Sequence, residues 1–246
     1  MKQIFLLVII ALCLACSNEQ KALTIHTIGD STMANKSEKA RPEEGWGEEI
    51  VSHIVDTSKV HHINYAVNGR STKSFIDEGR WEEAKKNIVQ GDYVFIQFGH
   101  NDQKSEDSTR YTNAQTTYKA NLRTYVRESR ALGAKPVLFT SIVRRNFNEH
   151  GVLIDTHGNY AEAVRQVATE LNVPLVDAQL LSEKLVLSYG PEPSKQLYNH
   201  VAEGHPNYPL GKADDTHLNH NGAVAIANLI VAELKQIDPI LAEILN

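Results

Sequence analysis

Residues 93–102 read "YVFIQFGHND", and they place a run typical of a β-strand directly before a polar loop. Aromatic and β-branched side chains favour the pleated surface of a strand, so YVFIQF predicts a strand. Glycine, asparagine and aspartate are turn-forming residues, so GHND marks the point where that strand ends. The same succession of strand and polar loop recurs along the chain, and it decides the fold class.

Short strand-like runs alternate with longer amphipathic runs from residue 22 onward. We expect strands at 22–28, 60–67, 93–98, 135–142 and 173–178. We expect helices at 46–55, 74–89, 114–133 and 160–171, and a last helix whose apolar stripe runs from Ala223 to Leu234. This alternation predicts an α/β fold of three layers (α/β/α), with a mainly parallel sheet and right-handed crossovers.

The stretch 188–216 interrupts this alternation. It is rich in proline, glycine, asparagine and aromatic residues, so we expect an irregular loop. Loops of this length are uncommon in compact domains unless they serve a function. The sequence therefore predicts a functional loop just before the last helix.

The N-terminal residues differ in character from the rest of the chain. Lys2 precedes an apolar run at 4–15, which is typical of a secretion signal and too short to span a bilayer. The segment "LCLAC" resembles a lipoprotein signal, in which the last cysteine, here Cys16, is lipidated. Cys13 stands where such signals usually have leucine, so ordinary cleavage remains the alternative. We expect a signal peptide at 1–16, a tether at 17–22 and one domain at 23–246.

The composition of the chain limits its expected cellular location and its expected binding partners. The chain has 246 residues, which suits one domain of roughly 200 to 250 residues. Both cysteines lie in the leader, so the domain has neither a disulfide nor a thiol nucleophile. A net charge of -5 without a basic stripe argues against a nucleic-acid partner. We expect an exported lipoprotein facing the periplasm or cell surface, otherwise a periplasmic or secreted protein, with membrane contact only through its lipid.

Four polar loops should meet at one edge of the predicted sheet. In such folds, ligands bind outside the carboxyl ends of the strands. Three of the loops follow the first three strands, and the fourth precedes the last helix. They are residues 29–31 (GDS), 68–71 (NGRS), 99–102 (GHND) and 214–217 (DDTH).

These loops contain the groups that acyl transfer requires. A serine hydroxyl needs a base, the base needs an acceptor that sets its tautomer, and the developing oxyanion needs donors. Asp214 and His217 can meet if the residues between them turn back, while Gly69 and Asn101 offer a backbone and a side-chain donor. No Gly-x-Ser-x-Gly occurs, which argues against an α/β-hydrolase elbow.

The choice of nucleophile lies between two serines. Ser31 follows the first strand, whereas Ser71 is better interpreted as a turn residue. Asp215, beside Asp214, is expected to be solvated. The histidines show no H-E-x-x-H or comparable ligand spacing, so we expect no metal and no cofactor.

The chain resembles the SGNH (GDSL-type) hydrolases on the blocks GDST, NGRS, GHND and DDTH, which occur in this order. Within that superfamily it is most similar to the rhamnogalacturonan acetylesterases, on "IGDSTMA", "GWG", "NGRSTKSF", "GDYVFIQFGHND", "PVLFTSIVRR" and "DDTHLN". The resemblance covers nearly the whole chain after the leader. It implies a five-stranded parallel sheet of flavodoxin-like order.

The resemblance also implies roles for the rim residues. Ser31 is then the nucleophile, His217 the base and Asp214 its orienting partner. The oxyanion hole would consist of the Ser31 N–H with Gly69 and Asn101. The implied function is an exported carbohydrate esterase that deacetylates a pectic polysaccharide or oligosaccharide, rhamnogalacturonan above all, through an acyl-enzyme.

Three alternatives stay open from the sequence. The first is the same chemistry on acetylated xylan or another ester. The second is a non-catalytic glycan-binding lipoprotein, which would be expected to lose one of Ser31, Asp214 or His217. The third is a metal-dependent hydrolase at the same rim, which chelators would inhibit.

Several further side chains are candidates for substrate contact. Because galacturonate bears a carboxylate, the guanidinium groups of Arg70, Arg144 and Arg145 could bind the polymer, or they could tie loops together instead. Tyr198 and Tyr208 lie in the long irregular stretch and could stack on sugar rings. Two tryptophans, Trp46 and Trp81, begin amphipathic stretches and are expected in the core.

Overall fold

The computed structural model describes residues 22–246. The predicted signal peptide, Cys16 and all of the predicted tether except Ala22 lie outside the described residues. Within the described part, every helix is too short or too polar to cross a membrane.

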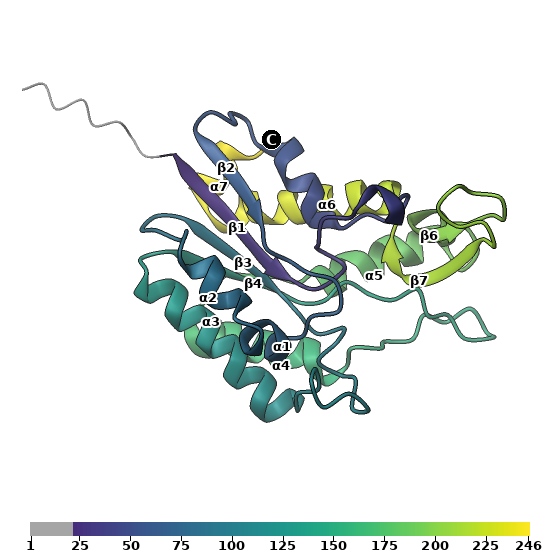
Figure 1. Cartoon of the computed structure of the whole chain (residues 1–246), viewed down its shortest axis with the longest axis horizontal. Helices are drawn as coiled ribbons and strands as arrows, with labels where there is room; N and C mark the ends of the chain where they lie inside the picture. The colour runs from purple at the N-terminus through teal and green to yellow at the C-terminus, as the bar shows by residue number, and fades with distance from the viewer. Residues whose placement is uncertain (1–21) are drawn as a thin grey trace, which may run out of the picture.

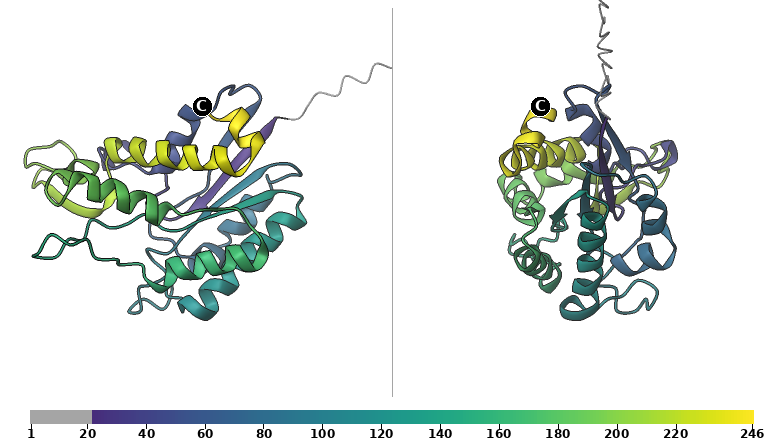
Figure 2. Two further views of the ribbon diagram at one scale, coloured as in Figure 1. Left: turned by 180° about the vertical axis from the view of Figure 1, so that it is seen from behind. Right: turned by 90° about the vertical axis from the view of Figure 1, so that its left-hand side faces the viewer.

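The centre of the molecule is a sheet of five parallel strands in the order β2-β1-β3-β4-β5 (Figure 1). Helices cover both of its faces, as the two views in Figure 2 show. The α/β/α prediction is therefore confirmed, and the strand order is the flavodoxin-like one. The strands are β1 (Leu23–Gly29), β2 (Val60–Asn64), β3 (Tyr93–Gln97), β4 (Lys135–Phe139) and β5 (Leu175–Val176).

Two apolar clusters fill the spaces between the sheet and its two helical layers. Strand β3 is wholly buried and alternates between them, with Phe95 in one cluster and Val94 and Ile96 in the other. One layer holds α1 (Thr72–Asp77), α2 (Arg80–Lys85), α3 (Lys119–Ala131) and α4 (Asn159–Leu171). The other holds the 3₁₀ helix η2 (Trp46–His53), α5 (Ala178–Tyr189), α6 (His220–Ile237) and α7 (Pro239–Ile244).

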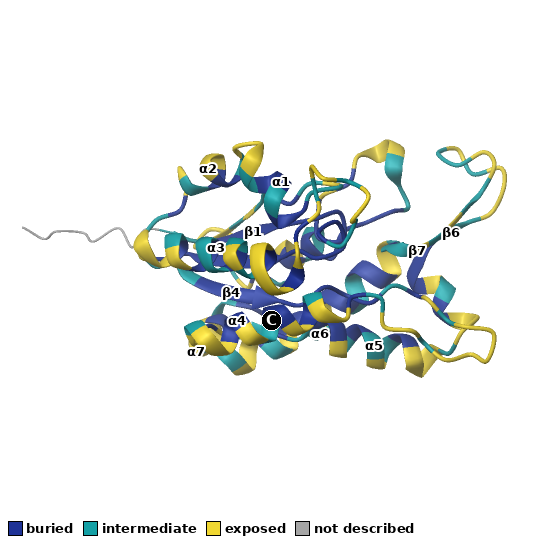
Figure 3. Cartoon of the chain, turned by 90° about the horizontal axis from the view of Figure 1, so that it is seen from below, coloured by how far each residue is buried: buried dark blue, intermediate teal, exposed yellow. Residues whose placement is uncertain are grey.

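The predicted tryptophans and the last helix lie as expected. Trp46 and Trp81 are buried on opposite sides of the sheet. The stripe of α6 from Ala223 to Leu234 faces the core, and exposed residues lie on the outer surface of the helices in Figure 3.

Three predicted helices differ in detail from the structure. The single helix expected at 74–89 is two helices, because Gly79 adopts a left-handed φ of 72° between them. Residues 46–53 form a 3₁₀ helix, and a π-helical turn at Ala114–Tyr118 precedes α3. Helices α5 and α7 were not predicted from the sequence.

The prediction of an irregular loop at 188–216 is wrong. Helix α5 runs to Tyr189, and a 3₁₀ turn, η4 (Pro193–Leu197), leads into an antiparallel hairpin. The hairpin consists of β6 (Tyr198–Val201) and β7 (Lys212–Leu218), which form a separate two-stranded sheet. This hairpin carries the DDTH segment.

Candidate active site

The Gly29–Asp30–Ser31 loop turns sharply out of β1. A Cβ on Gly29 would lie 2.7 Å from the carbonyl oxygen of Gln97, so only glycine fits this close approach between strands. The buried Asp30 holds the turn, because its Oδ1 accepts hydrogen bonds from the Thr32 N–H (2.9 Å) and hydroxyl (2.8 Å). Ser31 is thereby presented at the carboxyl edge of the sheet.

Asp30 also connects this loop to the loop after β3. Its Oδ2 lies 3.2 Å from Nδ1 of His100, which is also buried. Burial raises the pKa of Asp30, but the His100 ring and the Thr32 hydrogen bonds outweigh it and hold that pKa below its usual range. Burial lowers the pKa of His100, so a neutral ring donates from Nδ1 to an ionised Asp30.

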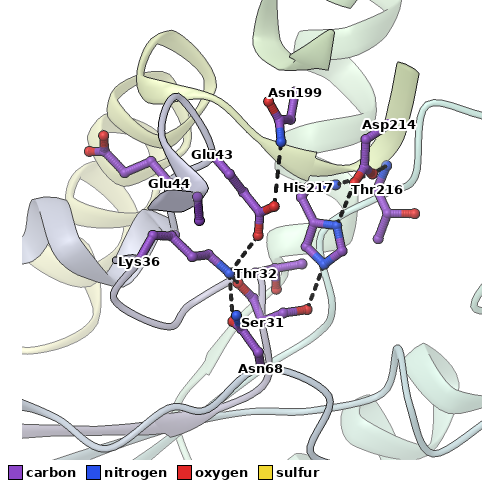
Figure 4. Close-up of polar contacts among 12 residues, drawn as sticks. Ser31, Thr32, Lys36, Glu43, Glu44, Asn68, Asn199, Asp214, Thr216 and His217 are labelled. Atoms are coloured by element: carbon purple, nitrogen blue, oxygen red, sulfur yellow. Dashed lines mark hydrogen bonds and ion pairs between the residues drawn. The ribbon is translucent and has the colours of Figure 1, made fainter. Parts of the chain in front are cut away.

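Ser31, His217 and Asp214 form a hydrogen-bonded series (Figure 4). Ser31 Oγ lies 2.8 Å from Nε2 of His217, whose Nδ1 lies 2.9 Å from Oδ2 of Asp214. The other oxygen of Asp214 accepts hydrogen bonds from the N–H groups of Thr216 and His217, at 2.9 and 3.0 Å. Although burial raises the pKa of Asp214, His217 and these N–H groups lower it below its ordinary value, so Asp214 stays ionised.

An irregularity in the β6–β7 hairpin brings the acid and the imidazole together. Tyr198 pairs with Leu218, but its neighbour Asn199 pairs with Asp214, so residues 215–217 fall outside the ladder. Such a bulge redirects side chains that a regular strand would place on alternate faces. The expected turning back of the chain is present, but it occurs at the end of a strand, and α6 begins only at His220.

The two loops proposed to bind the oxyanion contact each other. Asn101 is buried, and its Nδ2 donates to the carbonyl oxygen of Arg70 at 3.0 Å. Gly69 adopts a left-handed φ of 77°, which lets the chain turn at this position. The structure therefore brings Gly69 and Asn101 together at the same edge of the sheet as Ser31.

A buried lysine, which the sequence analysis missed, joins these loops. The side chain of Lys36 is 0% exposed, and its Nζ lies 2.5 Å from the carbonyl oxygen of Ser31 and 2.7 Å from Oδ1 of Asn68. Its third partner is Oε1 of Glu43 at 2.9 Å (Figure 4). No local pattern distinguishes such a lysine from a solvated one, because its partners come from different parts of the chain.

The same network continues to the triad acid. Lys212 Nζ lies 3.3 Å from Oε2 of Glu43 and 3.2 Å from Oδ2 of Asp214. Burial raises the pKa of Glu43, but Lys36 and the other cations nearby lower it below its ordinary value. A chain of alternating charges, Lys36–Glu43–Lys212–Asp214, thus links the backbone of Ser31 to its own triad.

Within residues 22–246, two groups of side chains bring metal-ligand atoms close together. In the first, ligand atoms of Glu43, Asp214 and His217 lie within 4.8 Å of one another. Lys212 already contacts both carboxylates and Lys36 contacts that of Glu43, so the charge that a metal would balance is largely compensated. In the second group, Glu44, Glu49 and His220 meet at the start of α6.

The cluster of Glu44, Glu49 and His220 should make the stability of the fold depend on pH. The hydrogen bond with Glu44, and secondarily burial, raises the pKa of Glu49 to about 7, against 4.5 for a free side chain. The folded state therefore binds this proton more tightly, and stability falls as the pH rises from 4.5 to 7. We expect Glu49→Gln to raise the Tm at pH 8 by about 2–4 °C, the shift for roughly 1 kcal/mol, and to change it little at pH 4.5.

Thermal unfolding of both proteins at the two pH values, followed by circular dichroism, measures this difference. The exposed Glu203 provides a matched control, since Glu203→Gln should have the same Tm as wild type at both pH values. An equal effect of Glu49→Gln at pH 4.5 and pH 8 would contradict the assignment of the raised pKa to Glu49.

The three candidate arginines tie loops together, the alternative that the sequence left open. Arg70 donates to Glu78 and to the Asn68 carbonyl, and Arg144 donates to the His100 carbonyl at 3.2 Å. Arg145, 7% exposed, lies 2.9 Å from Asp215. Asp215 is exposed, as expected, and its carboxylate also pairs with Nε2 of His200 at 2.7 Å.

The two candidate tyrosines differ in their exposure to solvent. Tyr198 is 1% exposed and donates from its hydroxyl to the Val143 carbonyl at 2.8 Å, so its prediction as a substrate contact is wrong. Tyr208 is half-buried, and its hydroxyl donates to the Ala40 carbonyl at 2.6 Å. Ser71 caps α1 and accepts from the Ser74 N–H, in agreement with a structural role.

Comparisons with known proteins identify the family of the chain. Residues 27–225 match the model of the GDSL-like Lipase/Acylhydrolase family. The chain is 37% identical to rhamnogalacturonan acetylesterase RhgT of Bacillus subtilis (strain 168) over 89% of this chain and 92% of that protein. It is 34% identical to the probable rhamnogalacturonan acetylesterase YesY of the same strain, over 87% and 93% of the two chains. The crystal structure of YxiM from Bacillus subtilis superposes with a TM-score of 0.73 at 30% identity, covering 88% of this chain and 57% of that chain.

Proposed function

Because the chain belongs to the GDSL-like lipase/acylhydrolase family, we propose that it removes acetyl groups from a pectic polysaccharide, rhamnogalacturonan above all. The observation that carries this proposal is the hydrogen-bonded series from Ser31 through His217 to Asp214 at the carboxyl edge of the sheet. The identity to RhgT and YesY, over most of each chain, supports the choice of substrate.

The first half of the reaction transfers the acetyl group to Ser31. The hydroxyl oxygen attacks the ester carbonyl carbon while Nε2 of His217, 2.8 Å away, accepts the hydroxyl proton. Asp214 holds the ring in the tautomer that leaves Nε2 free and stabilises the imidazolium that forms. The C–O bond to the sugar then breaks, and His217 protonates the departing sugar oxygen.

The second half returns the enzyme to its starting state. A water molecule attacks the acetyl-enzyme carbonyl, and His217 accepts a proton from that water. The bond to Ser31 breaks, acetate leaves, and His217 returns the proton to the serine oxygen. The N–H groups of Ser31 and Gly69 and the side chain of Asn101 stabilise the oxyanion in both halves. Each such donor contributes about 10²- to 10³-fold in rate.

The N-terminal sequence supports export of this enzyme. We propose that Lys2 and the apolar run at 4–15 form a signal peptide, and that a lipid on Cys16 anchors the domain to a membrane. The predicted tether at 17–22, which includes the polar stretch "SNEQK", separates Cys16 from the domain.

A panel of substrates tests the proposed function. Acetate release is measured with the purified chain on acetylated rhamnogalacturonan, acetylated xylan and a small aryl acetate, with and without a chelator. We expect the highest kcat/KM on rhamnogalacturonan and no effect of the chelator. A preference for xylan would overturn the choice of polymer, and chelator-sensitive activity would overturn the metal-free mechanism. Binding of the polymer without any acetate release would identify a glycan-binding protein instead.

A further inference from the structure

A groove of about 660 Å³ begins beside Gly69. Its walls are the 69–70 turn, helix α1 with the following Glu78, and the 107–110 turn. The charged residues that line it are Arg70, Lys73, Asp77, Glu78, Asp107 and Arg110. Because the proposed oxyanion donor Gly69 lies at its margin, a sugar chain in this groove would continue from the sugar that carries the reacting ester.

Arg110 differs from the other two cations of the groove. Nε of Arg70 donates to Glu78 and its Nη1 to the Asn68 carbonyl, while Lys73 contacts Asp77 and the Ser108 carbonyl. Arg110 donates only from Nε, to Asp107 at 2.6 Å. Within residues 22–246, its two terminal nitrogens donate no hydrogen bond.

The position of Arg110 places this free end next to the proposed reaction centre. Its Nη1 lies 3.7 Å from the point that a Cβ on Gly69 would occupy. A further cation, Lys104, lies near Arg110, since burial and then the charges of Arg110 and Arg144 lower the pKa of Lys104. The side chain of Arg110 is 32% exposed, so a ligand can reach it.

We propose that this groove is a subsite for the acidic part of the substrate, in which the terminal nitrogens of Arg110 bind a galacturonate carboxylate of the polymer. A planar guanidinium with two free nitrogens matches the two oxygens of a carboxylate. The inference rests on the proposed function, because it needs a polymer that carries both acetyl esters and carboxylates. It assigns the recognition of charge to a residue outside the triad.

The test compares an acidic polymer with its uncharged derivative. Arg110→Ala, Arg110→Lys and wild type are assayed on acetylated rhamnogalacturonan, on the same polymer with its carboxyl groups methyl-esterified, and on an aryl acetate. For Arg110→Ala we expect the ratio of kcat/KM on the acidic polymer to kcat/KM on the aryl acetate to fall about 10- to 100-fold, mainly through KM. Arg110→Lys should lose less, since it keeps the charge but not the planar pair of donors.

Arg123→Ala is the matched control. Arg123 is 29% exposed, pairs with Glu170 and lies on α3 outside the groove lining, so its loss should leave the ratio unchanged. On the methyl-esterified polymer, wild type and Arg110→Ala should have the same ratio, because the carboxylate is absent.

Each of the remaining outcomes is decisive. An unchanged ratio for Arg110→Ala on the acidic polymer overturns the subsite, while acetate release by wild type leaves the proposed function standing. An equal loss on the acidic and the methyl-esterified polymer overturns charge recognition. Failure of wild type to deacetylate rhamnogalacturonan, with activity retained on the aryl acetate, rejects the proposed substrate itself.

Discussion

Replacing Ser31 by alanine is expected to lower kcat for acetate release by about 10⁴-fold or more, the range reported for loss of a serine nucleophile. The 2.8 Å contact to His217 would be lost, and no other hydroxyl is proposed to take the acetyl group. Because Ser31 is small and lies at the edge of the sheet, the fold should persist. Steady-state kinetics on the aryl acetate and on the acetylated polymer, with a thermal melt of each protein, measures the effect.

Ser71→Ala is the control for this experiment. Ser71 is the other serine of the four polar loops, but its hydroxyl caps α1 by accepting from the Ser74 N–H at 3.1 Å. Its loss should cost about 1 kcal/mol of stability, as for other helix caps, and leave kcat within a few-fold of wild type. If Ser31→Ala keeps most of its activity while Ser71→Ala is inactive, the assignment of the nucleophile is wrong.

Lys36→Met is expected to be the most destabilising single substitution among the site residues. Lys36 has three oxygen partners, and its removal leaves the carboxylate of Glu43 with one fewer cation in a largely buried position. Breaking a buried ion pair by removing one partner costs about 3–5 kcal/mol. The kcat of the folded variant should also be lower than that of wild type, because Lys36 holds the Ser31 carbonyl and the Asn68 loop in place.

A second substitution separates the charge effect from the loss of packing. In Lys36→Met/Glu43→Gln the uncompensated carboxylate is gone, so the double variant should recover part of the stability that Lys36→Met loses. Lys212→Met is the control for the same network: its side chain is 30% exposed, and Glu43 and Asp214 keep their contacts to Lys36 and His217. Urea unfolding of the four proteins measures the free energies of unfolding. A double variant no more stable than Lys36→Met would show that the buried charge is not the cause.

Local pattern was enough to predict the central architecture. The strand at 93–97 begins with four successive aromatic or β-branched residues, and the structure buries all of it between two apolar clusters. The polar loops after the first three strands meet at one edge because parallel strands end on the same side of a sheet. Those two rules do not depend on distant contacts, so they could be applied to the sequence directly.

The hairpin of β6 and β7 could not be predicted from the sequence, because it does depend on contacts between separate segments. Its strands are largely polar, the segment between them contains proline and glycine, and each strand is defined only by its pairing with the other. Tyr198 illustrates the consequence, because an aromatic residue in a segment without periodicity gives no sign of whether it faces the core. Lys36 and Arg110 were missed for a related reason: a charged residue in a loop has the same local pattern whether it is buried, paired or free.

By itself, the sequence determined the α/β/α fold, the edge of the sheet at which the site lies, and the residue types available there. Hydrophobic periodicity and turn-forming residues act over a few neighbouring positions, so they can be identified directly in the sequence. Only the tertiary structure decided that residues 215–217 bulge so that Asp214 reaches His217, that Lys36 joins Ser31 to Asn68 and Glu43, and that Arg110 lies beside Gly69. These arrangements depend on distances between residues far apart in the chain, which the packing of the sheet, the helices and the hairpin sets.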